Sequence, residues 1–233
     1  MNSLIEEHGL DNPERIYENV LSFDDLKKTN VAFLCGKISR TPYHHMPICE
    51  ETIPLVDKLV KVNEYGFFSM EGQPAIKSGG ILKMSWFDSC GNLCSNWFYE
   101  THQKSFISGI MESHHVDNFI SFLKTKPVYF VIFGFPYKII FNNFPHDHYN
   151  VTKTRYNKYE NKIFESEWCH ISNINNDDDY KLMKFEEYPN IDKFIKTNCV
   201  SVDIASYEYN DEYSVENLLI EYFESINKSR QVH

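Results

Sequence analysis

The segment spanning residues 41–74 constrains the fold of this chain of 233 residues more than any other, because its pattern leaves little choice of secondary structure. Apolar residues recur at helical spacing, so we predict a helix over 50–65. Gly66 would end this helix, and the aromatic run that follows predicts a strand over 67–70. The segment therefore predicts a helix that leads directly into a strand.

The remaining pattern mixes helices and strands without regular alternation. Periodicity and capping signals predict helices over 23–35, 114–124, 191–196 and 214–226, and β-branched or aromatic runs predict strands over 82–87, 93–99, 128–133, 137–141 and 200–205. A loop is expected through Gly79 and Gly80. Because strands and helices do not alternate as in a doubly wound sheet, we expect an α+β fold, with mixed β-sheets flanked by helices. The length fits one domain over 1–233.

Charge and hydropathy argue against two kinds of partner. The formal net charge is -10, and Lys and Arg form no cluster that could follow a phosphate backbone, so we expect no nucleic acid partner. The longest apolar run, 128–135, is far shorter than the roughly 20 residues of a membrane-spanning helix, and no membrane partner is expected. We therefore expect a soluble, cytoplasmic protein. Its abundant Asn, Lys, Ile and Tyr are typical of an AT-rich source such as a giant virus or a protist.

The 6 cysteines are scattered without paired spacing, which favours free thiols over disulfides. Cys90 and Cys94 alone have a spacing that suits a metal, and a zinc site would need a second pair of ligands from His114–His115 or from His146 and His148. The residues around Gly91 are also typical of a hairpin turn between two strands. The turn is the simpler interpretation, so no metal is expected.

Several positions match one known family in order and spacing: Pro42, Glu51, Thr52, Leu59, Asn63, Gly66, Ser69, Gln73 and Pro74. Together they resemble a segment of the C-terminal regulatory domain of eukaryotic methylenetetrahydrofolate reductase, which binds S-adenosylmethionine. A second stretch, 99–106, resembles a downstream segment of that domain. The resemblance is best supported over 22–141, finds no counterpart over 142–198, and is loose over 199–229. It implies an α+β fold like that of the regulatory domain.

The resemblance also implies a ligand site. Its candidate residues are Glu51, Thr52, Ser69 and Gly72, which match ligand contacts of the family, with Gln73, Gln103 and His44 as neighbouring candidates. An acid suits the sulfonium and ammonium groups of S-adenosylmethionine, whereas hydroxyl groups and a helix N-terminus suit its carboxylate. Gly72 stands where the family has serine, so one hydroxyl is missing. Without a ligand, Glu51 and Thr52 would only occupy the first turn of a helix.

The expected function is the binding of S-adenosylmethionine, S-adenosylhomocysteine or a related nucleoside by a sensor or sequestering protein that stands alone. The catalytic half of the reductase is a flavin-binding barrel that takes about 250 residues by itself, so neither flavin nor folate reduction is expected. One alternative is an enzyme that acts on S-adenosylmethionine or a related nucleotide in the same pocket, although no motif identifies catalytic residues. Another is an interaction module with a vestigial pocket, which would contact a protein partner or a second copy through its acidic, Tyr-rich C-terminal third.

Overall fold

The computed structural model describes most of the chain. The described residues are 1–43, 48, 52–87, 93–134, 137, 139–141, 151–157, 162–168, 185–207, 212 and 214–231. Within them, the backbone alone is described for 76–87, 93–103, 140–141, 151–157, 162–168 and 229–231.

The protein has an α+β fold built around a five-stranded sheet. The strands follow the order β1-β4-β9-β5-β6, and each neighbouring pair is antiparallel. Their bounds are Phe67–Gln73 for β1, Phe106–Glu112 for β4, Cys199–Ser206 for β9, Tyr129–Phe133 for β5 and Ile139–Phe141 for β6. Every residue of β5 and β9 is buried, as expected for strands covered on both faces.

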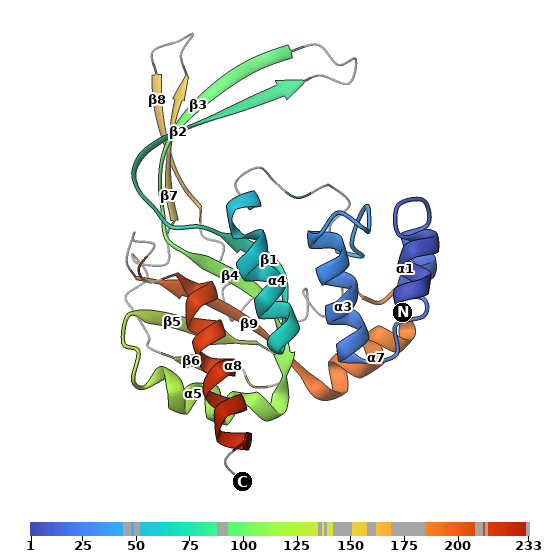
Figure 1. The fold of residues 1–233 in the computed structure, drawn as a ribbon. Coiled ribbons are helices and arrows are strands. Elements are labelled where there is room, and N and C mark those ends of the chain that lie inside the picture. Colours follow the sequence, from blue (N-terminus) through green and yellow to red (C-terminus); the bar gives the residue numbers. More distant parts are fainter. Residues whose placement is uncertain are drawn as a thin grey trace.

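Helices cover this sheet (Figure 1). The α-helices are α1 (Asn2–His8), α2 (Pro13–Tyr17), α3 (Phe23–Leu34), α4 (Val56–Tyr65), α5 (Val116–Leu123), α7 (Pro189–Asn198) and α8 (Val215–Gln231), with 3-10 turns η1 (Ile53–Leu55) and η2 (Ser113–His115). Successive residues of β1 enter different cores: Phe67 packs with residues of α4, α5 and α8, whereas Phe68 packs with residues of α2, α3 and α7. The sheet is therefore sandwiched between two helical layers at β1.

A second, four-stranded antiparallel sheet extends from one end of the first (Figure 1). Its order is β2-β3-β7-β8, with bounds Ile76–Phe87, Leu93–Gln103, Val151–Asn157 and Lys162–Trp168. β2 follows β1 and β3 precedes β4, so this hairpin continues the β1–β4 pair outward.

Local signals located most elements of the first sheet and its helices. Ser22 caps α3 by accepting a hydrogen bond from the Asp25 backbone N–H at 3.1 Å, and Gly36 follows the helix with φ 72°. The predicted helix over 50–65 begins instead with the 3-10 turn η1 and becomes α-helical at Val56. It ends at Gly66, whose φ of 150° favours glycine.

Other parts of the prediction are wrong or incomplete. Gly79 and Gly80 do not form a loop but lie inside β2, next to a register irregularity between Ile76 and Gly80. Glycine is common where a strand is irregular, so the same signal fits a bulge as well as a loop. The strands β7 and β8 and the helices α1 and α2 were not predicted at all. The proposed turn around Gly91 lies outside the described residues.

Two further expectations concern the cysteines and the membrane. Cys35 and Cys199 are free thiols, as expected, the first exposed and the second buried. In the described part of the chain, no helix has both the length and the apolar character needed to cross a bilayer.

Candidate functional site

The described candidate residues gather at the start of α4 and the end of β1. Thr52 directly precedes η1, and Gly72 and Gln73 are the last residues of β1. A Cβ atom at Gly72 would lie 3.4 Å from Cδ2 of Leu59 on α4, so the two elements are in contact there. Ser69 lies further back along β1. We refer to this end of the α4–β1 unit as the predicted cradle.

The other candidates are less fully described. Gln103 is the last residue of β3, and its side chain lies outside the description. His44 and Glu51 lie outside the described residues, although they fall in the segment between Tyr43 and Thr52, which are both described. The structure therefore places Thr52 before η1 and α4, places Gly72 and Gln73 at the end of the strand that contacts α4, and describes both ends of the segment that carries His44 and Glu51.

Thr52 does not cap the helix that it precedes. Its carbonyl oxygen accepts a hydrogen bond from the Leu55 N–H at 2.9 Å, but its side chain makes no capping bond. Leu55, at the start of α4 itself, has no side-chain cap either. The first N–H groups of a helix lack intrahelical acceptors and carry partial positive charge. Neither Thr52 nor Leu55 supplies a side-chain oxygen to these donors, whereas the Leu55 and Val56 N–H groups bond to the carbonyl oxygens of Thr52 and Ile53.

Ser69 belongs to a buried polar network of four side chains. Its hydroxyl oxygen accepts hydrogen bonds from Nδ2 of Asn63 at 2.7 Å and from Nδ2 of Asn30 at 3.2 Å. The same Asn30 amide donates to Oδ1 of Asn63 at 2.9 Å, and the Tyr43 hydroxyl donates to Oδ1 of Asn30 at 2.8 Å. Ser69, Asn63 and Asn30 are at most 5% exposed. The Ser69 hydroxyl is thus engaged inside the protein rather than at its surface.

This network fixes the elements that surround the predicted cradle. Asn30 comes from α3, Asn63 from α4 and Ser69 from β1, so it ties three elements together. Tyr43, the residue directly before His44, belongs to the same network. Its ring packs edge-on against Phe68 with centroids 5.6 Å apart. Burial raises the pKa of the Tyr43 hydroxyl. A network whose members satisfy one another makes a core rigid and specific, and here it anchors one end of the segment 44–51.

A second polar cluster lies beside the cradle at the start of α8. The Ser214 hydroxyl donates to Oε2 of Glu216 at 2.9 Å, and the Ser105 hydroxyl approaches the same oxygen at 3.4 Å. Lys58 of α4 reaches the Ser214 hydroxyl at 3.4 Å. Gln73 is linked to this cluster, because its side-chain amide donates to the backbone carbonyl of the residue before Ser105 at 3.1 Å. None of these cluster residues except Gln73 was predicted from the sequence.

Glu216 is fully buried, and its second carboxylate oxygen, Oε1, has no hydrogen-bond partner among the described residues. Burial raises the pKa of its carboxyl above the usual range, against the opposing effects of its hydrogen bonds and of the Lys58 charge. A folded-state pKa above the unfolded value means that the stabilising effect of the bound proton is complete below the unfolded pKa. That effect is lost as the pH rises through the folded pKa.

We therefore expect Glu216→Gln to gain stability relative to the wild type as the pH rises from about 4 to about 8, because the glutamine carries no charge to bury. Urea unfolding of both proteins across this range measures the difference. Glu224→Gln is the matched control on the same helix and should show a smaller change of opposite sign. Hydrogen bonds from Lys61 and Tyr65 lower the pKa of Glu224, so its ionised form is the stabilising one. A pH-independent difference for Glu216→Gln would contradict the assignment of a buried, titrating carboxyl.

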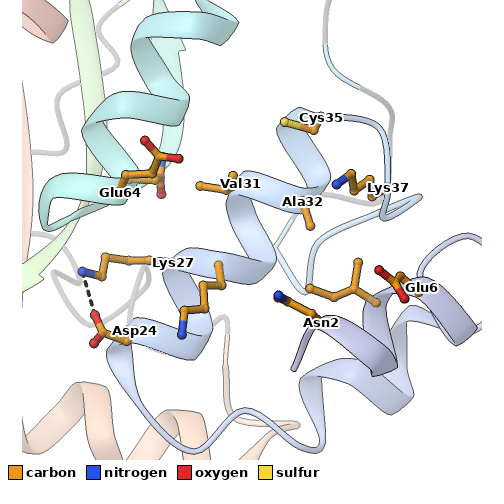
Figure 2. A pocket seen from close by; sticks show the side chains of 12 residues that line it. Asn2, Glu6, Asp24, Lys27, Val31, Ala32, Cys35, Lys37 and Glu64 are labelled. Atoms are coloured by element: carbon orange, nitrogen blue, oxygen red, sulfur yellow. Dashed lines mark ion pairs between the residues drawn. The ribbon is translucent and has the colours of Figure 1, made fainter.

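A groove of about 420 Å³ lies on the other side of α4, between α1, α3 and α4 (Figure 2). It carries both signs of charge, from Glu6, Asp24, Lys27, Lys28, Lys37 and Glu64. Lys27 and Asp24 form an ion pair at 2.9 Å, drawn as the dashed line in Figure 2. Of the candidate residues whose side chains are described, Thr52, Ser69, Gly72 and Gln73, none lines the groove, but Asn63 of the buried network does. Val31 of α3, which is half-buried, also lines the groove.

No protein-family model matches the chain, and a search of curated proteins finds no match either.

Proposed function

We propose that this chain binds S-adenosylmethionine, S-adenosylhomocysteine or a related nucleoside in the predicted cradle. The observation that carries the proposal is that the side chain of Thr52 makes no capping bond to the helical turn that it precedes. Threonine is a favoured helix cap, but among the described residues the Thr52 hydroxyl caps no helix N–H group. The resemblance assigns ligand contact to this same threonine and to the neighbouring Glu51.

The chemistry of the cradle suits a zwitterionic ligand. A ligand carboxylate is favoured at the positive pole of α4, where the first turn carries the Lys58 ammonium beside the acidic Asp57. The ammonium or sulfonium group of the ligand would be matched by the Glu51 carboxylate. Within the proposal, Thr52 and Lys58 therefore recognise the carboxylate end, and Glu51 the cationic part.

Ser69 takes a different role in this proposal from the one that the resemblance implies. Its hydroxyl oxygen already accepts hydrogen bonds from Asn63 and Asn30, so it positions β1 beneath the cradle rather than contacting the ligand. Gly72 is half-buried at the end of β1, and a side chain there would meet the flexible end of Leu59. The missing side chain at Gly72 leaves room at the cradle, at the cost of one hydroxyl contact.

Calorimetric titration of the full chain with S-adenosylmethionine and, separately, with S-adenosylhomocysteine tests the proposal. Binding should give a saturable heat with one site per chain. The absence of both heat and a thermal shift at millimolar concentrations of either ligand, in protein that is folded by circular dichroism, would overturn it. Mass spectrometry of the ligand after incubation tests the enzymatic alternative, because a binding protein leaves the ligand intact.

We expect Glu51→Gln to weaken binding by more than tenfold, because it removes the charge that faces the cationic part of the ligand. Glu64→Gln is the matched control: it removes the same charge from a residue that lines the groove on the other side of α4. It should leave the dissociation constant unchanged. The opposite result, loss of binding in Glu64→Gln and none in Glu51→Gln, would move the ligand site from the cradle to the groove.

A further inference from the structure

Three potential metal ligands lie together at the far end of β4, away from the cradle. Glu112 is the last residue of β4, and His114 and His115 belong to the turn η2 that follows it. One donor atom of each side chain lies within 4.8 Å of those of the other two. The two imidazole rings are 4.0 Å apart between centroids. Two imidazoles and a carboxylate form a donor set that zinc uses in proteins.

The surroundings of His115 hold its ring in a defined position. The side chain is 8% exposed, and Phe223 and Tyr222 of α8 contact the ring edge-on at centroid distances of 5.3 and 6.0 Å. By contrast, His114 is exposed and Glu112 is half-buried. One ligand is therefore fixed by packing, whereas the other two can turn toward an ion at the surface.

Tyr222 lies against both the backbone and the ring of His115. The Tyr222 hydroxyl donates to the backbone carbonyl of His115 at 3.0 Å, and the same oxygen lies 3.4 Å from Nδ1 of the ring. In the tautomer that carries its proton on Nδ1, the ring donates to this oxygen. The lone pair of the neutral ring is then on Nε2. Metal-binding histidines in proteins commonly donate their second ring nitrogen to a protein acceptor in this way.

We propose that Glu112, His114 and His115 bind a divalent transition-metal ion of the zinc class. His115 would ligate through Nε2, Glu112 and His114 would complete the protein ligands, and water would take a fourth position. Donor atoms of a tetrahedral zinc site are about 3.3 Å apart, so the two adjustable side chains close by rotation. The mixed nitrogen and oxygen donors favour such an ion over Ca²⁺ or Mg²⁺, which prefer oxygen alone.

This site does not depend on the nucleoside proposal. Glu112 stands at the opposite end of β4 from Phe106, which pairs with Gln73 of the cradle. Seven residues of strand separate the two ends by about 20 Å. The sequence offered no sign of the site beyond the adjacent histidines, because the pairing of η2 with Tyr222 joins residues that are 107 positions apart.

The test is a competition titration of the full chain with Zn²⁺ against a chromophoric chelator, repeated with Co²⁺ to record the ligand-field absorption of the bound ion. The chain has 10 histidines and 6 cysteines, so the comparison is between variants. His114→Ala and Glu112→Gln should each weaken the tightest site by at least tenfold and reduce the Co²⁺ absorption. The control His44→Ala/His45→Ala removes the other adjacent histidine pair of the sequence, and it should keep both the affinity and the spectrum.

Tyr222→Phe tests whether the cluster of Glu112, His114 and His115 binds a metal or has only a structural role. It removes the acceptor of Nδ1–H, and loss of such a partner typically weakens a metal site by about tenfold or more. Equal Zn²⁺ affinity and equal stoichiometry in the wild type, His114→Ala and Glu112→Gln would overturn the proposal. So would loss of the tightest site in the His44→Ala/His45→Ala control. Circular dichroism of each variant confirms that the protein measured is folded.

Discussion

Asn63→Ala is expected to lower the free energy of unfolding by about 3–5 kcal/mol. Asn63 is 0% exposed. Its Nδ2 donates to the Leu59 carbonyl at 2.8 Å and to the Ser69 hydroxyl at 2.7 Å, and its Oδ1 accepts from Nδ2 of Asn30 at 2.9 Å and from the Ser69 N–H at 3.2 Å. The substitution leaves buried donors without an acceptor and opens a cavity between three elements. Each buried group that loses its partner costs about 1–3 kcal/mol.

Asn198→Ala provides the matched control, measured by urea unfolding under the same conditions. Asn198 also donates its side-chain amide to the carbonyl four residues earlier, that of Phe194 at 3.2 Å, but on an exposed helix end. Its removal should change the free energy of unfolding by no more than about 0.5 kcal/mol. A cost below about 1 kcal/mol for Asn63→Ala would mean that the network can be lost without consequence. Other interactions would then have to hold Tyr43 and Ser69 in place.

The elements that could be predicted from the sequence are those whose signals are local. Ser22, Asp25 and Gly36 lie within a few residues of the helix ends that they mark, and these ends are as expected. Gly66 marks the end of α4 for the same reason. Signals of this kind depend on backbone geometry and neighbouring side chains, which a short stretch of sequence contains. The glycine at Gly80 fits both a loop and an irregular strand, and the local sequence does not decide between the two structures.

The candidate site likewise contains parts that the sequence could predict and parts that it could not. The helix and the strand that carry Thr52 and Gly72 could be predicted because Gly66 marks the boundary between them. The network could not be predicted, because Asn30 and Ser69 are 39 positions apart and Asn30 alone looks like any polar residue of a helix. Glu216 and Ser105 are separated by 111 positions. Ser214 and Glu216 alone predict only a helix start, and Glu216 is a buried carboxylate because Ser105 and α4 lie against that end of α8.

Gly109→Ala is expected to lower the free energy of unfolding by more than about 3 kcal/mol. A methyl group that overlaps a backbone atom cannot be accommodated by moving a side chain. Gly109 lies in the middle of β4, opposite Ser69 of β1 and Val202 of β9. A Cβ atom there would overlap the Phe68 carbonyl oxygen and lie 2.8 Å from Cζ of Phe67. A rotamer change can move the ring but not the carbonyl, so β1 itself must shift.

That shift makes Gly109→Ala a test of the cradle as well as of the core. Moving β1 displaces Ser69 from Asn63, so the variant should lose ligand affinity along with stability wherever it remains folded. Gly72→Ala is the matched control in the same β1–β4 ladder, opposite Ile107, where the new Cβ would meet only Leu59 side-chain atoms at 3.4 and 3.6 Å. Its free energy of unfolding should stay within about 1 kcal/mol of the wild type. Urea unfolding that found equal costs for the two variants would contradict the close packing of β1 on β4, on which the position of Ser69 depends.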